Sequence, residues 1–235
     1  MGFSQSDVEA LSAALGEPSW LRERRLEAWG YAEKLDLPRE KDEPWRYTDL
    51  RRLKFSLEAF AATDPGVSAG SLAVGPLDPA AAERGVVVSS LHDGLASHPE
   101  VVQKALFSGT NPGQDVFAAL HVALFSRGAF VYVPAGVTVA LPIEITHELA
   151  AGGVGFFPHD VVVVDEGAEV VVIGRYRSGD LPAASLSDAG VDLVAGPGSR
   201  VSYVSLQEYG AGVWHFLNQR APVDRQAVFR SLVVS

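Results

Sequence analysis

The sequence predicts a mainly β protein in which a β-solenoid follows a mainly helical N-terminal region. Two observations in its 235 residues lead to this fold class. Valine is concentrated towards the end of the chain, where residues 128–235 hold 21 of the 31 valines. In the same segment Gly136, Gly167 and Gly198 recur at equal intervals, and each has a valine three positions later.

Residues 1–127 form the predicted helical region. A capping box, in which the side chains of Ser6 and Glu9 bond each other's backbone, begins a first helix. Pro18 suits the first turn of a second helix. The apolar residues of this second helix recur near the 3.6-residue period and leave Arg25 on the face towards water.

The rest of the N-terminal region is mixed. Residues 61–84 are rich in Ala, Gly, Pro and Ser and are expected to form a variable, irregular connection. A strand is predicted at 85–91, a short helix at 99–107 and a further helix at 115–125.

Residues 128–235 contain the internal repeat. Each repeat glycine is expected to form a tight turn that leads into an alternating strand, and no stretch of the segment has helical periodicity. An all-β unit of about 30 residues, stacked on its neighbours, would bury the valines as successive coils of a solenoid. An antiparallel sandwich with three similar hairpins is the alternative.

Composition excludes several classes of protein. The chain has no cysteine, so it has no thiolate nucleophile and no cysteine ligand for zinc or iron. A net charge of −10 argues against a nucleic-acid partner. The chain does not begin like a signal peptide, and its longest apolar runs are far shorter than the roughly 20 residues that cross a bilayer. We therefore expect a cytoplasmic protein without a membrane partner.

No catalytic, cofactor-binding or metal site is predicted. The chain lacks the GxxxxGK[ST], GxSxG and HExxH motifs, and no two of its six histidines lie at ligand spacing. His121 is expected to flank the apolar face of the helix at 115–125, and His159 to serve a turn at the start of a strand. Strand alternation puts His215 opposite Trp214 and Phe216.

Several segments resemble the SufB/SufD family of iron–sulfur cluster assembly scaffold proteins. They are PWRYTDLRRL at 44–53, the run at 117–145, DVVVVDEGAEVVVI at 160–173 and residues 199–235. The PWRYT element together with the helical front resembles the SufD branch. The family implies a right-handed parallel β-helix after an N-terminal helical region. It also implies a scaffold subunit, not an enzyme, that joins a SufB-like protein and a SufC-like ATPase in a complex where a cluster is built.

The resemblance also implies a longer protein. Family members continue with further coils and a C-terminal helical segment that engages SufC, whereas residues 231–235 lie within a predicted strand. We therefore expect 128–235 to be the first coils of the β-helix, with the cluster ligands and the SufC-binding segment beyond Ser235. This fragment is expected to bind no cofactor, and it could form a homodimer through its β-edges.

One group of residues is predicted to line a passage. In the SufB branch the region matching 207–220 carries Gln, Trp and Lys on the inner side of the β-helix, along a route for sulfur. Gln207 matches the Gln, Tyr209 replaces the Trp, and Gln219, followed by Arg220, replaces the Lys. The resemblance therefore implies an interior passage without the amine of a SufB-type sulfur acceptor. A hydrogen-bonded strand residue is the alternative for Gln207.

The PWRYT element has two interpretations. Trp45, Arg46 and Tyr47 could present a basic aromatic patch to a partner. Alternatively, Trp45 and Tyr47 anchor the helical front onto the β-helix while the arginines stay solvated, and we favour this interpretation.

Two other functions compete with the scaffold. A carbohydrate-active parallel β-helix enzyme would need charged side chains grouped on one solenoid face. Asp165, Glu166 and Glu169 do not recur in the next coil, which counts against it. A plain β-solenoid interaction domain is the other alternative.

Overall fold

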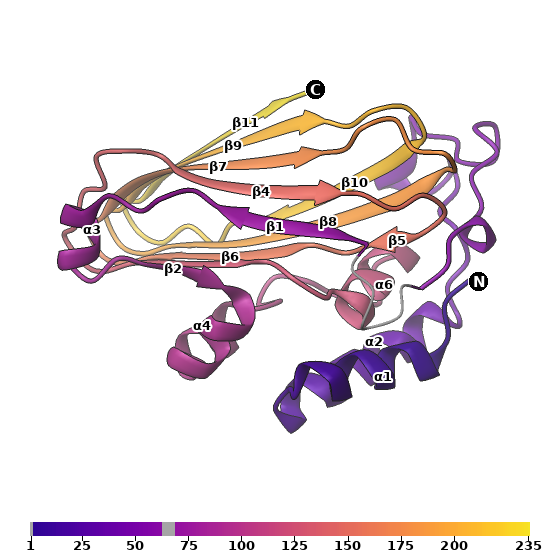
Figure 1. The fold of residues 1–235 in the computed structure, drawn as a ribbon, viewed down its shortest axis with the longest axis horizontal. Coiled ribbons are helices and arrows are strands. Elements are labelled where there is room, and N and C mark those ends of the chain that lie inside the picture. Colours follow the sequence, from indigo (N-terminus) through magenta and orange to yellow (C-terminus); the bar gives the residue numbers. More distant parts are fainter. Residues whose placement is uncertain (1, 63–68) are drawn as a thin grey trace.

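The chain folds into a parallel β-solenoid with helices along one side, as Figure 1 shows. The computed structural model describes residues 2–62 and 69–235. Four coils run from β3 to β4, β6 to β7, β8 to β9 and β10 to β11, and successive coils stack in parallel. The predicted solenoid with a helical N-terminal region is therefore confirmed. No helix in the described part of the chain is long and apolar enough to cross a membrane.

Two sheets form the walls of the solenoid. The first sheet consists of β1 (Gly70–Val74), β4 (Ile143–Leu149), β7 (Glu169–Arg177), β9 (Arg200–Glu208) and β11 (Val228–Val234). The second consists of β2 (Val87–Ser90), β3 (Ala129–Val133), β6 (His159–Val164), β8 (Ser185–Ala195) and β10 (Val213–Arg220), and the short β5 (Gly155–Phe156) also pairs with β8. The valines of both sheets meet between them and fill the interior.

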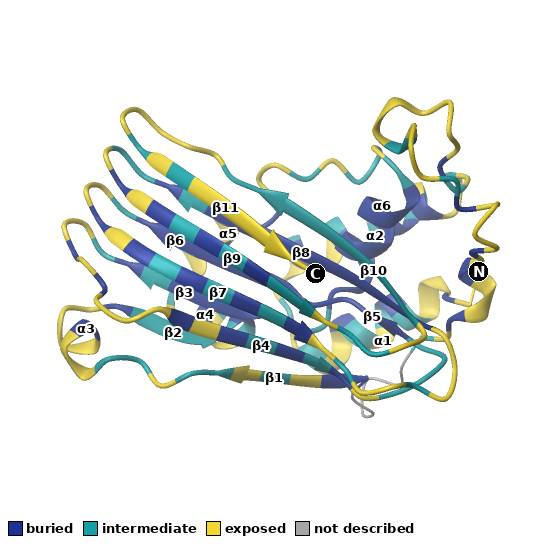
Figure 2. Cartoon of the chain, turned by 90° about the horizontal axis from the view of Figure 1, so that it is seen from above, coloured by how far each residue is buried: buried dark blue, intermediate teal, exposed yellow. Residues whose placement is uncertain are grey.

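The predicted repeat sets the register. Phe130 pairs with Val161 and Glu169 with Arg200, at the same interval that separates the repeat glycines. The last coil is shorter. Fewer residues separate Arg200 from its partner Val228 in the last coil than separate Glu169 from Arg200 one coil earlier. Strand alternation then sends every second side chain inward, and Figure 2 shows the resulting bands of buried residues along β7 and β9.

The repeat glycines form the turns at one end of the solenoid. Gly136, Gly167 and Gly198 have φ angles of +70°, +66° and +65°, a region that residues with a Cβ adopt at a cost. Their N–H groups donate to the matching turn of the next coil, for example from Gly167 to the Pro197 carbonyl at 2.9 Å. Gln226 has the corresponding conformation in the fourth turn, with a φ of +58°.

Antiparallel strands close the first coil. β1 runs antiparallel to β4, and β2 runs antiparallel to β3. Both strands come from the N-terminal region, so the two regions share their sheets. The irregular connection expected at 61–84 is wrong where the chain forms β1 and the short helix α3 (Pro79–Glu83), because alternating side chains of β1 pack on β4. Residues 63–68 lie outside the described residues.

The helices cover the outer face of the second sheet. They are α1 (Gln5–Leu15), α2 (Ser19–Ala32), α4 (Leu91–Ser97), α5 (Pro99–Ala105) and α6 (Val116–Leu124), and single 3-10 turns span Glu43–Trp45 and Leu57–Ala59. Their apolar faces form a second core with outward side chains of the sheet such as Val161 and Val163. The capping box lies two residues earlier than predicted, because Ser4 and Asp7 make the reciprocal bonds.

The expected position of Arg25 on the solvent-exposed face of α2 is wrong. Its side chain is completely buried and donates to Glu17 at 2.7 Å and to the carbonyl of Ala123 in α6 at 2.9 Å. The guanidinium also lies 3.9 Å from the centre of the Phe125 ring. Arg25 therefore forms a buried ion pair with Glu17, and its hydrogen bond to Ala123 joins α2 to the end of α6.

The PWRYT element contacts the protein through one aromatic ring. Trp45 stacks on Phe117 of α6, with ring centres 5.2 Å apart, and lies 5.8 Å from Phe216 of β10. Tyr47 is 92 % exposed, so the anchoring role expected of it is wrong. Arg46 is also exposed, lies 4.0 Å from Glu43 and sits over the Tyr47 ring.

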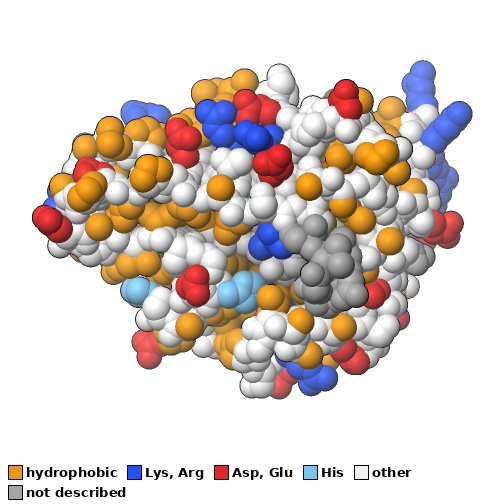
Figure 3. All heavy atoms as spheres, in the orientation of Figure 1, with side chains coloured by type: hydrophobic (Ala, Val, Ile, Leu, Met, Phe, Trp, Pro, Cys, Tyr) orange, Lys and Arg blue, Asp and Glu red, His pale blue; other side chains and the backbone are white. Residues whose placement is uncertain are grey.

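The outer face of the first sheet carries charges of both signs. Figure 3 shows these side chains gathered over its strands. Arg175 lies 3.1 Å from Glu208 and 3.9 Å from Glu144, and Arg177 lies 3.4 Å from Glu148. These exposed pairs each contribute about 0–1 kcal/mol and mark a solvated face.

The turns allow a reciprocal test. Replacing Gly167 by Ala should lower the free energy of unfolding by about 1 kcal/mol through backbone strain alone, because no atom lies within 4 Å of the added Cβ. Gln226→Gly should raise it by about 0.5–1 kcal/mol. Urea unfolding measures both. Gly179→Ala, which has equal space and no positive φ, is the control and should not be destabilising. Equal effects of the two alanine substitutions would contradict the strain argument.

A second pair of variants separates the two aromatics. Trp45→Ala should cost about 2–4 kcal/mol of unfolding free energy, because it removes a ring packed between α6 and β10. Tyr47→Ala should change it by less than about 0.5 kcal/mol, because that ring is exposed. Thermal melts followed by circular dichroism give both values, and similar losses in the two variants would refute this assignment.

Candidate functional site

A row of polar side chains runs inside the solenoid. Nε2 of His147 lies 3.0 Å from both carboxylate oxygens of Asp160, across the interior from β4 to β6. The His147 ring stacks on Tyr176 of β7 at 5.3 Å, and the Tyr176 hydroxyl lies 3.1 Å from that of Tyr203 in β9. These four residues are buried, so the first three coils are connected by polar and aromatic contacts.

The row continues into the fourth coil. The ring of His215 in β10 lies 5.3 Å from Tyr176, and its Nδ1 is 3.1 Å from the Ser187 hydroxyl. Ser187 also shares a hydrogen bond of 2.7 Å with the hydroxyl of Tyr209. As the sequence predicted, His215 points away from Trp214 and Phe216, whose rings contact Phe55 among the helices.

Burial fixes the charge states along this row. It raises the pKa values of Tyr176, Tyr203 and Tyr209 above their usual range, so these hydroxyls remain protonated. Burial also lowers the pKa of His215 to about 4, which leaves its ring neutral at pH 7. The row can therefore orient a polar guest by hydrogen bonds, but it holds no lysine and no thiol.

The structure divides the residues predicted to line an interior passage. Gln207 lies on the inward side of β9, where it pairs with the buried Tyr176, and Tyr209 contacts Ser187. Gln219 accepts a hydrogen bond of 2.8 Å from Ser231 of the opposite sheet. Arg220 does not belong to the interior. As the next residue along the strand it points outward, where it donates to Gln114 before α6 at 2.8 Å.

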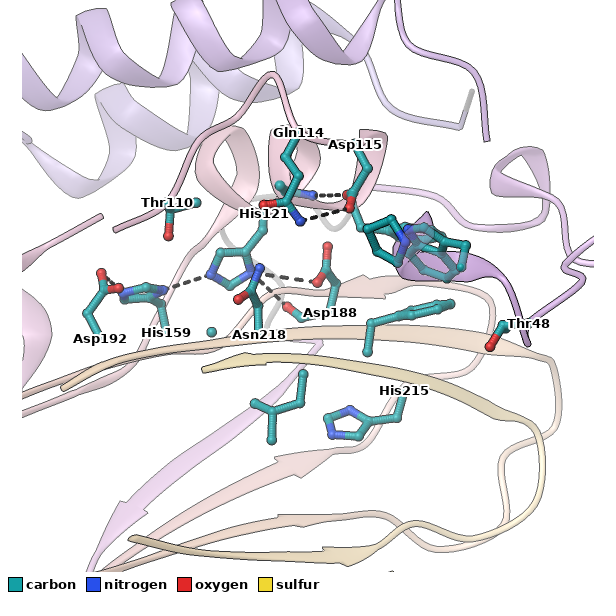
Figure 4. A pocket seen from close by; sticks show the side chains of 17 residues that line it. Thr48, Thr110, Gln114, Asp115, His121, His159, Asp188, Asp192, His215 and Asn218 are labelled. Carbon is teal, nitrogen blue, oxygen red and sulfur yellow. Dashed lines mark hydrogen bonds and ion pairs between the residues drawn. The ribbon is translucent and has the colours of Figure 1, made fainter. Parts of the chain in front are cut away.

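A second polar site lies on the outer face of the same sheet. It is a pocket of about 360 Å³ between the start of α6, the Trp45 turn and strands β8 and β10. Figure 4 shows its polar lining, in which Asp192, His159, His121 and Asp188 follow one another from left to right. Trp45, Phe117 and Phe216 form an apolar wall. We refer to this site as the outer pocket.

Its two histidines share a hydrogen bond. Nε2 of His121 lies 2.8 Å from Nδ1 of His159. The far nitrogen of His159 is 3.0 Å from Asp192, and that of His121 is 3.0 Å from the carbonyl oxygen of Asp188. Gly190 leaves room for this contact, since a Cβ there would collide with both rings.

The partners of this pair fix the direction of its hydrogen bonds. The Asp188 carbonyl can only accept, so Nδ1 of His121 carries a hydrogen. Burial and the neighbouring His159 lower the pKa of His121 to about 3, so this ring is neutral at pH 7 and its Nε2 accepts from Nδ1 of His159. The backbone N–H of Phe107 donates to Asp192, so one buried network connects α6, β6 and β8.

Sequence reasoning missed the outer pocket. No contact between His121 and His159 is expected from the sequence. In the structure both side chains are buried, and His159 lies on β6, which pairs with β8. Their contact joins a helix to a strand, so no local spacing shows it. The repeat contained a weak signal, because its register aligns Phe130 and Val161 of the first two coils with the charged Asp192 of the third.

No site for a metal ion is formed by three or more His, Asp or Glu side chains within residues 2–62 and 69–235. Every ring nitrogen of His121 and His159 already has a partner. These rings therefore do not offer a free ligand atom.

Comparison with known proteins gives the family. The SufBD core domain of the SUF iron–sulfur cluster assembly system matches residues 147–235, and the SufBD N-terminal region matches residues 70–145. The chain belongs to the SufBD family. The two matched regions meet within β4, and together they include the whole solenoid of this SufBD protein.

Curated relatives agree with this assignment. The SufD protein of Bacillus subtilis is 21 % identical over 243 residues, which cover 94 % of this chain and 56 % of the relative. A chloroplastic SufBD family protein of Arabidopsis thaliana is 23 % identical over 259 residues, covering 93 % and 46 %. A SufBD family protein of Synechocystis is 31 % identical over 146 residues, covering 59 % and 30 %. The SufBD chain thus spans about half or less of these relatives.

His215 in the interior row makes stability depend on pH. Its pKa of about 4 lies below the ordinary value of 6.5, so the unfolded chain binds this proton first as pH falls. The contribution of the neutral His215 to the free energy of unfolding is complete above pH 6.5 and is lost as the pH falls towards 4. Relative to His215→Gln, the wild-type SufBD protein should lose about 1 kcal/mol per pH unit in that window. Urea unfolding at several pH values measures the difference, and parallel curves would contradict it.

Proposed function

We propose that this protein acts as a SufD-like scaffold subunit in iron–sulfur cluster assembly, together with a SufB-like protein and a SufC-like ATPase. The observation that carries the proposal is the relation to a protein named SufD over 94 % of this chain, with both SufBD regions present. The solenoid would serve as a rigid platform, and the cluster would be cargo of the assembled complex.

The residues of this chain support a non-catalytic role. The chain has no phosphate-binding loop, so a partner would hydrolyse ATP. It has no cysteine, so thiolate ligands for a nascent cluster would come from elsewhere in the complex. The interior row offers hydroxyl, amide and imidazole groups, which can orient a polar sulfur species without forming a bond to it. The proposal retains the cytoplasmic location expected from the sequence.

The proposal is tested by co-purification. The full chain carries an affinity tag and is co-expressed with the SufB-like and SufC-like proteins of its own organism. We expect both to be retained in fixed ratio. Recovery of neither protein, from a tagged chain that melts cooperatively, would overturn the proposal.

The exposed part of the PWRYT element offers a variant for the same experiment. The sequence suggests a docking patch of Trp45, Arg46 and Tyr47, of which Arg46 and Tyr47 are exposed. The double variant Arg46→Ala, Tyr47→Ala should fold normally and reduce retention of a partner severalfold. Arg22→Ala, an exposed arginine on α2, is the matched control. Full retention by the double variant would exclude this patch as a docking site.

A further inference from the structure

The outer pocket has three carboxyl groups in its lining. Asp115, Asp188 and Asp192 line it, and no lysine or arginine does. Asp192 lies 3.0 Å from Nε2 of His159 and accepts from the Phe107 N–H, and Asp115 caps α6 by accepting from the Ala118 N–H. Asp188 differs from both, because the described residues provide no hydrogen-bond partner for its Oδ2.

Asp188 is buried without its normal partners. It is 3 % exposed, and its Oδ2 has no hydrogen-bond partner in the described part of the chain. Its Oδ1 lies 4.0 Å from Nδ1 of His121, which already donates to the Asp188 carbonyl. Figure 4 shows this carboxyl group directed into the pocket, between His121 and the aromatic wall. Leaving a buried carboxyl unpaired costs stability, which a bound ligand would recover.

The chemistry of the walls selects the kind of ligand. Trp45 and Phe117 stack with centres 5.2 Å apart, and Phe117 stacks on Phe216 at 4.1 Å. Aromatic rings beside a carboxylate favour an organic cation, because the rings attract positive charge and pack against an alkyl chain. A metal ion would need several free ligand atoms, and the histidine nitrogens here are occupied.

We propose that the outer pocket binds an organic cation, an alkylammonium or guanidinium group, whose charge is held by Asp188. The volume of about 360 Å³ suits a group of this size with part of its chain. A second pocket of about 370 Å³ shares Pro44, Trp45, Gln114 and Asp115 with the first, so a longer ligand can continue over Trp45.

Binding is coupled to proton release. Burial, with the nearby Asp115, raises the pKa of Asp188 well above its usual range, so the carboxyl group of the empty pocket holds a proton more tightly than an exposed aspartate does. The other titratable groups facing it are His121 on α6, Asp192 on β8 and His159 on β6, whereas the ring of His215 on β10 points to the opposite face of the sheet. An arriving cation stabilises the carboxylate, so the acid loses its proton to solvent and the ion pair forms.

Calorimetry on the full chain tests the proposal. The probes are putrescine, N-acetyl-lysine methylamide and N-acetyl-arginine methylamide, with N-acetyl-glutamine methylamide as the neutral analogue. We expect dissociation constants in the range of about 0.1–10 mM for the cations and no binding of the neutral analogue. Titrations in phosphate and PIPES, which differ in ionisation enthalpy and carry no net positive charge, should report release of up to one proton.

Two variants make the test specific. Asp188→Asn should weaken cation binding at least tenfold and abolish proton release, while its melting temperature stays equal or rises because a buried acid is removed. Asn218→Asp adds a carboxylate to the lining and should tighten binding severalfold. Asp224→Asn, on a turn outside the outer pocket, is the control.

The results distinguish between two sources of the cation and show which findings would contradict the proposal. Tighter binding of putrescine indicates a free polyamine, and tighter binding of the amino-acid derivatives indicates a side chain of another protein. Equal binding of the neutral analogue, unchanged binding by Asp188→Asn, or displacement of the cation by MgCl2 or ZnCl2 would overturn the proposal. The assembly role is tested by co-purification, so failure here leaves that role untouched.

Discussion

The stacking of each strand on the strand one coil away governs the whole molecule. In-register pairing gives each inward side chain its neighbours at the matching positions of the adjacent coils, so the interior is built in columns. Apolar columns are filled mainly by valine, whose branched side chain suits a pleated surface. A polar residue in a column must find its partner in an adjacent coil or across the interior. His147, Tyr176 and Gln207 form one such column, and Gly174 provides the space that the Tyr203 hydroxyl occupies.

The second sheet carries a polar site on each of its two faces. Along β6, His159 points to the outer pocket while Asp160 points inward to His147. Along β8, Asp188 and Ser187 divide in the same way. Alternation thus separates two polar sites by the thickness of one strand. Because helices cover the outer face and the first sheet covers the inner one, nearly all of β8 is buried. Polar groups on this strand have weak screening from water, and their interactions are correspondingly strong.

Sequence alone was sufficient where the structure is periodic, and it failed where partners come from distant elements. Equal glycine spacing predicted three turns, but the fourth was missed because Gln226 replaces glycine in a shorter coil. Helical periodicity assigned Arg25 to the solvent-exposed face, because the pattern places every charged residue there. In the structure the buried guanidinium has a carboxylate and a carbonyl as hydrogen-bond acceptors. The pairing of His121 with His159 required the packing of α6 on β6, which no single window of the chain contains. The predicted passage residues lie inside the solenoid except for Arg220, where strand alternation reverses the direction.

The antiparallel pairing of β1 and β2 has a consequence for how coils can stack. Both strands run opposite to the coil strands that they cover, and each is the outermost strand of its sheet. A further strand beside β1 or β2 would keep the direction of the coil strands only by pairing antiparallel with it. The two strands therefore cap the first coil, and parallel stacking of coils is interrupted at this end of the solenoid.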